Sequence, residues 1–172
     1  MLMEEIIQTL RERGSELREP IAVGKMKPMA FSCWLSPQGA TTNHIARAVE
    51  HCPDELRKFW EITSSAKLFE DRSYGQRGLN ILAPLEAEAE TQKRKEARPS
   101  EFTLGGLVIG RFLGDSDLLM IRCDADASDF GAVLIALPID PRGDWYHPAT
   151  GFEDFPKKYL EARGDKFWER RG

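Results

Sequence analysis

The spacing of apolar residues predicts helices in the first third of the chain. In residues 4–18, isoleucine and leucine recur with charges between them, as on one face of an amphipathic helix that ends near Gly14 or by Pro20. The threonine pair before residue 43 suits the N-cap of a second helix through residue 49. A third helix is predicted from Pro53, because the apolar residues that follow it share one helical face.

Beyond residue 66 the apolar residues form short runs separated by turn residues, a pattern that predicts β-strands. The predicted strands cover residues 68–69, 79–82, 102–112, 118–123 and 130–137. The connections between the last three are built from Gly, Asp and Ser, which favours an antiparallel meander. One largely solvated helix interrupts this region at 84–98, because acidic residues lead, basic residues follow and most of its apolar residues are alanines.

Two other segments have their own signatures. Prolines and glycines in residues 20–40 predict an irregular arm that docks through Phe31 and Trp34. Thr150 and Glu153 have the spacing of a capping box ahead of a last helix. These features complete the prediction of an α+β fold in which a mainly antiparallel meander is flanked by helices.

The length of 172 residues suits one domain with a core of its own. The predicted organisation is an N-terminal helix and irregular arm at 1–40, an α+β domain at 41–162 and a C-terminal tail at 163–172. The tail is expected to fray, apart from Phe167 and Trp168, which can dock on the core.

Composition narrows the classes of function. The 28 acidic and 24 basic residues give a net charge of −4, which disfavours binding to the nucleic-acid backbone. The longest run without charge or strong polarity, 130–139, is about half of what a membrane helix needs, and no secretory signal is recognisable, so a cytoplasmic location is expected. The three cysteines form no C-x-x-C pair, which predicts free thiols instead of a disulfide framework or a zinc site.

No set of residues has the pattern of a catalytic site, and neither enzyme activity nor a metal or cofactor is expected. The segment that begins at Asp126 resembles the opening strand of retroelement ribonuclease H domains, but two-metal chemistry needs further carboxylates in a following sheet and helices. Asp124 opens a stretch like a calcium loop, which lacks the required Gly at 129 and Glu at 135. A small metal-dependent nuclease built on Asp126 is therefore the weakest hypothesis.

Residues 115–129 hold five aspartates and one arginine, a local charge of −4. Aspartate suits turns without any function, but an acidic edge would also attract a basic protein partner. Beside it, an aromatic residue from the 144–147 segment can serve as an anchor. The candidate partner-binding residues are Asp115, Asp117, Asp124, Asp126, Asp129, Trp145 and Tyr146.

Four stretches, in order, resemble the SUKH superfamily, which contains bacterial immunity proteins and yeast cell-wall assembly regulators. Residues 53–60 are similar to the family's leading helix, and residues 68–81 to its paired strands. Residues 107–121 resemble its apolar strand that ends in Gly-Asp and continues into an aliphatic strand, here with Gly114-Asp115 at the junction. Residues 150–155 are similar to the closing helix, so the resemblance covers about residues 45–162.

The resemblance implies a role without catalysis. Bacterial members bind a cognate toxin, often a nuclease or another nucleic-acid-modifying domain, and block it. Because nuclease sites are basic, an acidic face would mimic their substrate and steer association. The alternative is a regulatory or scaffold domain, as in the eukaryotic members, that binds another protein and no toxin.

Overall fold

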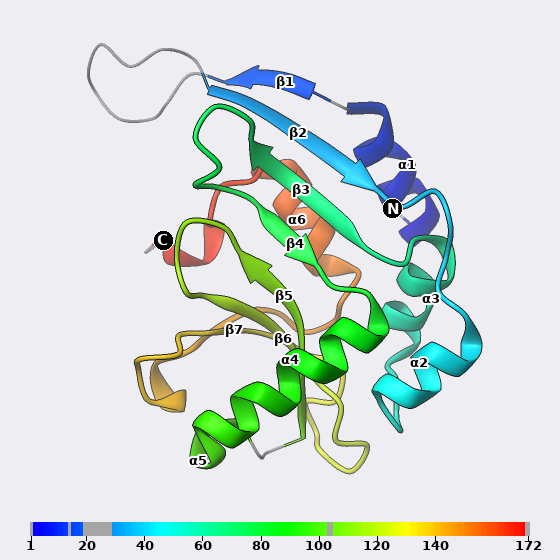
Figure 1. The fold of residues 1–172 in the computed structure, drawn as a ribbon, viewed down its shortest axis with the longest axis vertical. Coiled ribbons are helices and arrows are strands. Elements are labelled where there is room, and N and C mark those ends of the chain that lie inside the picture. Colours follow the sequence, from blue (N-terminus) through cyan, green and yellow to red (C-terminus); the bar gives the residue numbers. More distant parts are fainter. Residues whose placement is uncertain (1, 14, 19–28, 103–104, 171–172) are drawn as a thin grey trace.

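The computed structural model describes residues 2–13, 15–18, 29–102 and 105–170. Eight strands form one sheet in which each strand pairs with the next one along the chain (Figure 1). They are β1 (Ser15–Arg18), β2 (Met29–Leu35), β3 (Ala66–Asp71), β4 (Leu79–Ile81), β5 (Gly106–Phe112), β6 (Leu118–Arg122), β7 (Val133–Ala136) and β8 (Tyr146–Ala149). Every pairing is antiparallel, which confirms the predicted α+β class and meander.

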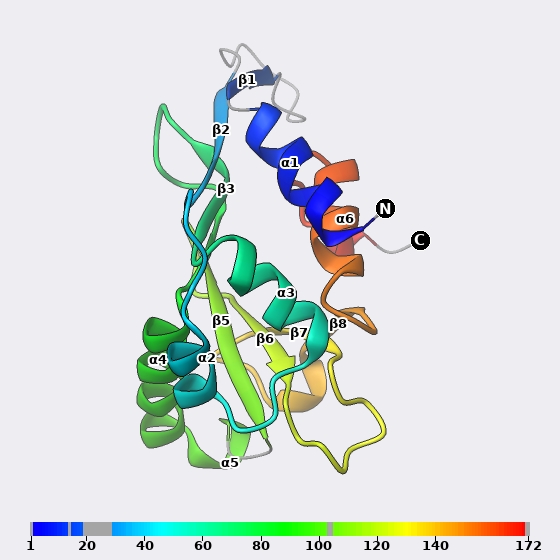
Figure 2. The ribbon, with the colours of Figure 1, turned by 90° about the vertical axis from the view of Figure 1, so that its right-hand side faces the viewer.

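Helices flank both faces of this sheet (Figure 2). One face carries α1 (Met3–Arg13), α3 (Asp54–Ile62) and α6 (Asp154–Glu161). The other carries α2 (Thr42–Ala48), α4 (Pro84–Ala97) and the short α5 (Pro99–Phe102). Two 3-10 turns complete the described elements, η1 (Arg142–Asp144) and η2 (Phe167–Glu169). On the second face the helices cover only part of the sheet, and the part formed by β2 and β3 has no helix over it.

The main hydrophobic core lies between the sheet and α1, α3 and α6. The predicted helix after Pro53 is confirmed, and its residues Leu56, Phe59 and Trp60 are fully buried. The indole N–H of Trp60 donates a hydrogen bond to the carbonyl oxygen of Leu82 at 3.0 Å. Strand side chains alternate between faces, so Leu118 and Met120 of β6 join a smaller second cluster on the other side, with Phe102 and Trp145.

The N-terminal segment is more regular than predicted. The first helix ends at Arg13, next to Gly14, which was one of the two ends that the sequence allowed, and residues 15–18 form β1, a strand that was not predicted. Residues 29–35 form β2, where an irregular arm was expected, because Phe31 and Leu35 point into the core and the strand pairs with β3. The sheet therefore crosses the boundary predicted near residue 41. Residues 20–28 of the predicted arm lie outside the described residues.

The C-terminal predictions had mixed outcomes. No capping box forms, because Glu153 has helical backbone angles and makes no side-chain cap. Its backbone N–H instead donates to the carboxylate of Glu55 at 3.0 Å, so α3 supplies the anion at the start of α6. Phe167 and Trp168 pack against the core, so the predicted docking is confirmed and the fraying is not seen over residues 163–170.

Two smaller predictions are confirmed. Thr41 caps α2, since its hydroxyl oxygen accepts a hydrogen bond from the backbone N–H of His44 at 3.2 Å. The three cysteines are free thiols: Cys52 is buried, and Cys33 and Cys123 are half-buried. Burial raises the pKa of Cys52 to about 11, partly offset by the nearby charge of Arg57. Burial likewise raises the pKa of Cys123 to about 12, so both of these thiols are protonated and unreactive at neutral pH.

Candidate functional site

The five candidate aspartates do not form one acidic edge. Asp115 and Asp117 lie in the connection between β5 and β6, whereas Asp124, Asp126 and Asp129 lie in the connection between β6 and β7. These connections are at opposite ends of β6, a strand that spans roughly 17 Å at about 3.4 Å per residue. The structure thus divides the predicted surface into two groups with different surroundings.

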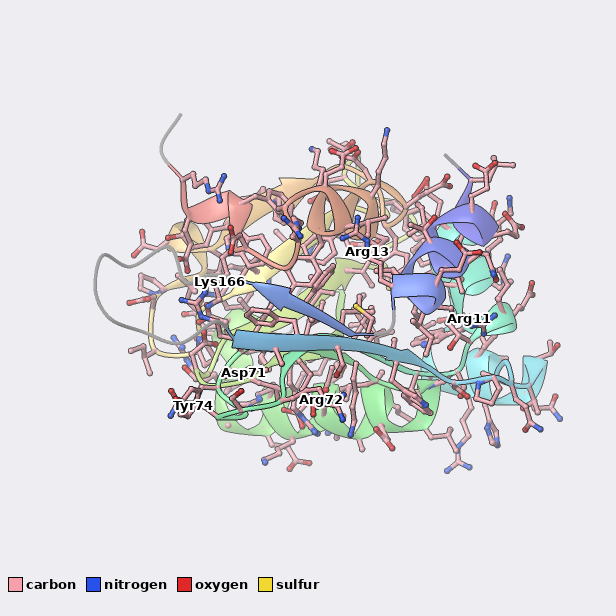
Figure 3. The ribbon with its side chains drawn as sticks, turned by 90° about the horizontal axis from the view of Figure 1, so that it is seen from above. Arg11, Arg13, Asp71, Arg72, Tyr74 and Lys166 are labelled. Carbon is pink, nitrogen blue, oxygen red and sulfur yellow. The ribbon has the colours of Figure 1, made fainter. Side chains whose placement is uncertain are left out.

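The first group is ion-paired within the protein, where one lysine serves both aspartates. The ammonium group of Lys166 donates hydrogen bonds to Asp115 and to Asp117, the latter at 3.0 Å. The same ammonium lies 5.5 Å from the ring centroid of Phe112, a cation–π contact. Lys166, labelled in Figure 3, belongs to the C-terminal segment, residues 163–170, whose Trp168 ring centroid lies 5.2 Å from that of Phe112 at the end of β5. Asp115 and Asp117 therefore hold the C-terminal segment in place and are poorly suited to attract a partner.

The charge of Lys166 contributes to stability in a pH-dependent way. Burial lowers its pKa, but the hydrogen bonds that it donates to Asp115 and Asp117 raise it more, so the net shift is upward. A raised pKa in the folded state means that the contribution is present below the ordinary lysine pKa of about 10.4 and is lost as pH rises through the higher folded value.

We expect Lys166→Met to reduce the free energy of unfolding by about 1 kcal/mol at pH 8, because the site is only partly buried. The difference from the unsubstituted protein should shrink as the pH rises through the raised pKa of Lys166, where this side chain loses its proton. Urea unfolding at pH 8 and at a series of alkaline pH values measures this change. Lys93→Met, at an exposed position of α4, is the matched control, and a gap that stays constant with pH would refute the assigned role.

The second group remains accessible. Asp124, Asp126 and Asp129 are exposed in the loop between β6 and β7, which extends beyond the sheet in Figure 2. Only Asp129 has an ion-pair partner among the described residues, Arg122 at 3.2 Å. In the same loop the aromatic ring of Phe130 is 38% exposed. An exposed aromatic ring among carboxylates is a combination suited to contact with a protein.

The connection between α2 and α3 adds charge beside this loop. Pro53 lies close to Gly131, since a Cβ added at residue 131 would be 3.8 Å from the proline side chain. The carboxylates of Glu50 and Asp54 on either side of Pro53 are almost fully exposed. We call this surface the acidic end. Its members are Glu50, Asp54, Arg57, Arg122, Asp124, Asp126, Asp129 and Phe130. Five of these residues carry carboxylates and two are arginines, so the formal charge of the acidic end is −3.

The two predicted aromatic anchors are not surface residues. Trp145 is buried in the second hydrophobic cluster, with its ring centroid 5.1 Å from that of Phe102. Its indole N–H donates to the carbonyl oxygen of Leu137 at 3.1 Å, so both its ring and its polar atom are used internally. Tyr146 is half-buried and packs against the main core. The expectation that Trp145 anchors a partner is therefore wrong, and Phe130 takes that position on the surface.

A cleft of about 650 Å³ opens between the β3–β4 connection, the end of β5 and the C-terminal segment. Phe112 and Tyr159 provide its apolar lining. Its basic residues largely meet internal acids, as in the pair of Arg170 with Asp165 at 2.9 Å. No serine, cysteine or histidine is among the described residues that line it. The cleft is thus lined by polar and apolar groups in similar measure, and its acidic and basic side chains balance in number.

In the described ranges, no three His, Cys, Asp or Glu side chains gather as ligands for a metal ion. No helix in this part of the chain is both long and apolar enough to cross a membrane. The sequence matches no protein-family model. It also matches none of the curated proteins.

Proposed function

We propose that this chain is a non-catalytic, cytoplasmic immunity protein that binds a cognate toxin and blocks it. The proposed toxin is a basic protein such as a nuclease or another nucleic-acid-modifying enzyme. The observation that carries this proposal is the acidic end, where Phe130 is exposed in the same loop as Asp124 and Asp126, which have no ion pair within the described residues. The resemblance of the four stretches in residues 45–162 to the SUKH superfamily supplies the class of partner.

The chemistry of the acidic end suits such a partner. A nuclease concentrates positive charge where it receives phosphates, and exposed carboxylates opposite that charge raise the rate of encounter. Asp124 and Asp126 have no basic partner among the described residues, so their charge is available. Phe130 would supply the apolar contact that slows dissociation once the two proteins have met.

The test compares two triple variants that remove equal charge. The first variant combines Asp124→Asn, Asp126→Asn and Asp129→Asn. Its association with a toxin encoded by a gene next to that of this chain should be at least about tenfold slower at low salt, because the electrostatic steering by these carboxylates is lost. The control variant, Glu4→Gln with Glu12→Gln and Glu161→Gln, removes three exposed carboxylates from α1 and α6. Stopped-flow association at low and at high salt measures both rates.

The control should retain the rate and the salt dependence of the unsubstituted protein. Equal slowing in both variants would show that only net charge matters and that the acidic end is not the contact surface. Co-expression with the toxin tests the function in cells, because the unsubstituted chain should restore the growth of cells that produce the toxin. Absence of binding and of rescue would reject the immunity role in favour of the regulatory or scaffold alternative.

A further inference from the structure

The part of the sheet that no helix covers carries one row of side chains across four strands. Trp34 of β2 pairs with Lys67 of β3, Lys67 with Asn80 of β4, and Asn80 with Arg111 of β5. Cross-strand partners project from the same face of a sheet. This row lies on the face opposite α1 and α3, next to α4 (Figure 2). We call it the open row.

The open row presents an aromatic ring and two cations to the solvent. Trp34 is 52% exposed, the largest exposed fraction of any tryptophan in the described chain. Lys67 is exposed and has no ion pair within the described residues. Arg111 is 47% exposed and binds Glu90 of α4 at 2.8 Å. Tryptophan and arginine are the residue types that contribute most to protein interfaces.

The one carboxylate that contacts the row within the described ranges is hidden beneath it. Glu90 is only 3% exposed and is shared between Arg111 and Arg94 of α4. Burial alone would raise its pKa, but the hydrogen bonds from both arginines lower it, so Glu90 is ionised at neutral pH. Glu70, three residues beyond Lys67, is half-buried. The solvent-facing charge of the row is therefore positive, although the whole chain is negative.

The middle of the open row lacks a hydrogen-bond donor. The side-chain oxygen Oδ1 of Asn80 is buried and accepts no hydrogen bond from the described residues. A buried acceptor without a partner destabilises a folded protein by roughly 1–3 kcal/mol. Asn80 lies between Lys67 and Arg111, and because its Oδ1 is buried, a donor that arrives between these two cations reaches it only when a neighbouring side chain moves aside. An exposed tryptophan alone needs no explanation, but this acceptor is an independent indication of a missing partner.

We propose that the open row binds an extended acidic segment of another protein, which crosses the strands. Adjacent strands lie about 4.8 Å apart, so Lys67 and Arg111 are separated by roughly 10 Å. A segment in the polyproline II conformation has three residues per turn and rises about 3.1 Å per residue, so its positions i and i+3 lie on one face about 9 Å apart. Two carboxylates at positions i and i+3 pair with the two cations, a main-chain N–H between them donates to Asn80, and an apolar side chain covers Trp34.

This surface is separate from the acidic end, so the proposal does not depend on the identity of the toxin. Arg111 precedes the β5–β6 connection, whereas the acidic end includes the β6–β7 connection at the other end of β6. The two surfaces also carry opposite charge. A basic toxin at the acidic end and an acidic segment at the open row can therefore be bound by one molecule.

The experiment titrates the 15N-labelled chain with the peptide acetyl-Gly-Glu-Ser-Ser-Glu-Leu-Gly-amide, and with the same peptide carrying Gln for both Glu. We expect shifts of the Trp34 indole N–H signal and of the Asn80 side-chain amide with the Glu peptide, and at least about tenfold weaker binding of the Gln peptide. Lys67→Glu and Trp34→Ala should each weaken binding about tenfold or more. Lys93→Glu, at an exposed position of α4, should not change it.

Three results would each overturn the proposal. The first is no shift at the open row with a large excess of the Glu peptide. The second is equal binding of the Glu and Gln peptides, and the third is a set of shifts confined to the cleft around Arg77. Thermal unfolding of each variant confirms that it is folded before the titrations are compared.

Discussion

The Gly114→Ala variant should lose about 2–4 kcal/mol of its free energy of unfolding. Gly114 has φ +87°, a region that costs L-residues about 1 kcal/mol or more. A Cβ at this position would lie 1.8 Å from the carbonyl oxygen of Gln76 and 2.6 Å from its carbonyl carbon. Both are backbone atoms, so the β3–β4 connection would have to move away, at a further cost of about 1–3 kcal/mol. Total stabilities are only about 5–15 kcal/mol.

Two other glycines separate the effect of the positive φ from the effect of the close contact with Gln76. Gly75 has φ +64° but no atom within 4 Å of a Cβ, so Gly75→Ala should cost only about 1 kcal/mol. Gly143→Ala meets neither obstacle and should be nearly neutral. Urea unfolding ranks the three variants. If Gly114→Ala were no less stable than Gly75→Ala, the close approach to Gln76 would not matter, and the Gly114-Asp115 pair would need another explanation.

Trp60→Ala should reduce the free energy of unfolding by about 3–5 kcal/mol, because it empties the space of the largest fully buried side chain. It also removes the hydrogen bond from the indole N–H to Leu82. Trp60→Phe keeps most of the apolar volume and loses that hydrogen bond, so its loss should be smaller. Urea unfolding followed by circular dichroism gives the three stabilities without relying on tryptophan fluorescence.

Trp34→Ala is the matched control for this series. The same side chain is deleted, but Trp34 is half exposed and its loss should change stability by no more than about 0.5 kcal/mol. Similar losses at the two tryptophans would contradict the burial that the structure gives them. The pair also ensures that a binding defect of Trp34→Ala is not a folding defect.

Simple periodicity was enough to predict the central part of the fold. The helix after Pro53 has three buried residues on one face, and the strands from β3 to β7 are apolar runs separated by turn residues. β2 was missed because prolines at 28 and 37 bracket it. The side chains of β2 nevertheless alternate between the two faces of the sheet. Phe31 and Leu35 are buried, whereas Trp34, which is an odd number of residues from each of them, is exposed.

The candidate site was less predictable, for two different physical reasons. Successive connections of an antiparallel meander lie at opposite ends of the sheet, so the separation of Asp115 from Asp124 was already implied by the predicted strands. The pairing of Lys166 with Asp115 was not readable, because 51 residues separate them. Phe130 had been placed in a strand, and only the structure shows that its ring is exposed in the loop.

The strand order has a consequence for how the chain folds during synthesis. Because each strand pairs with its predecessor, the sheet can grow strand by strand as the ribosome releases it. Asp115 and Asp117, however, form their ion pairs with Lys166, which is translated 49 residues after Asp117. The nascent sheet therefore passes through a stage with an unneutralised acidic turn and an uncovered aromatic surface at Phe112, which ends only when residues 163–170 emerge.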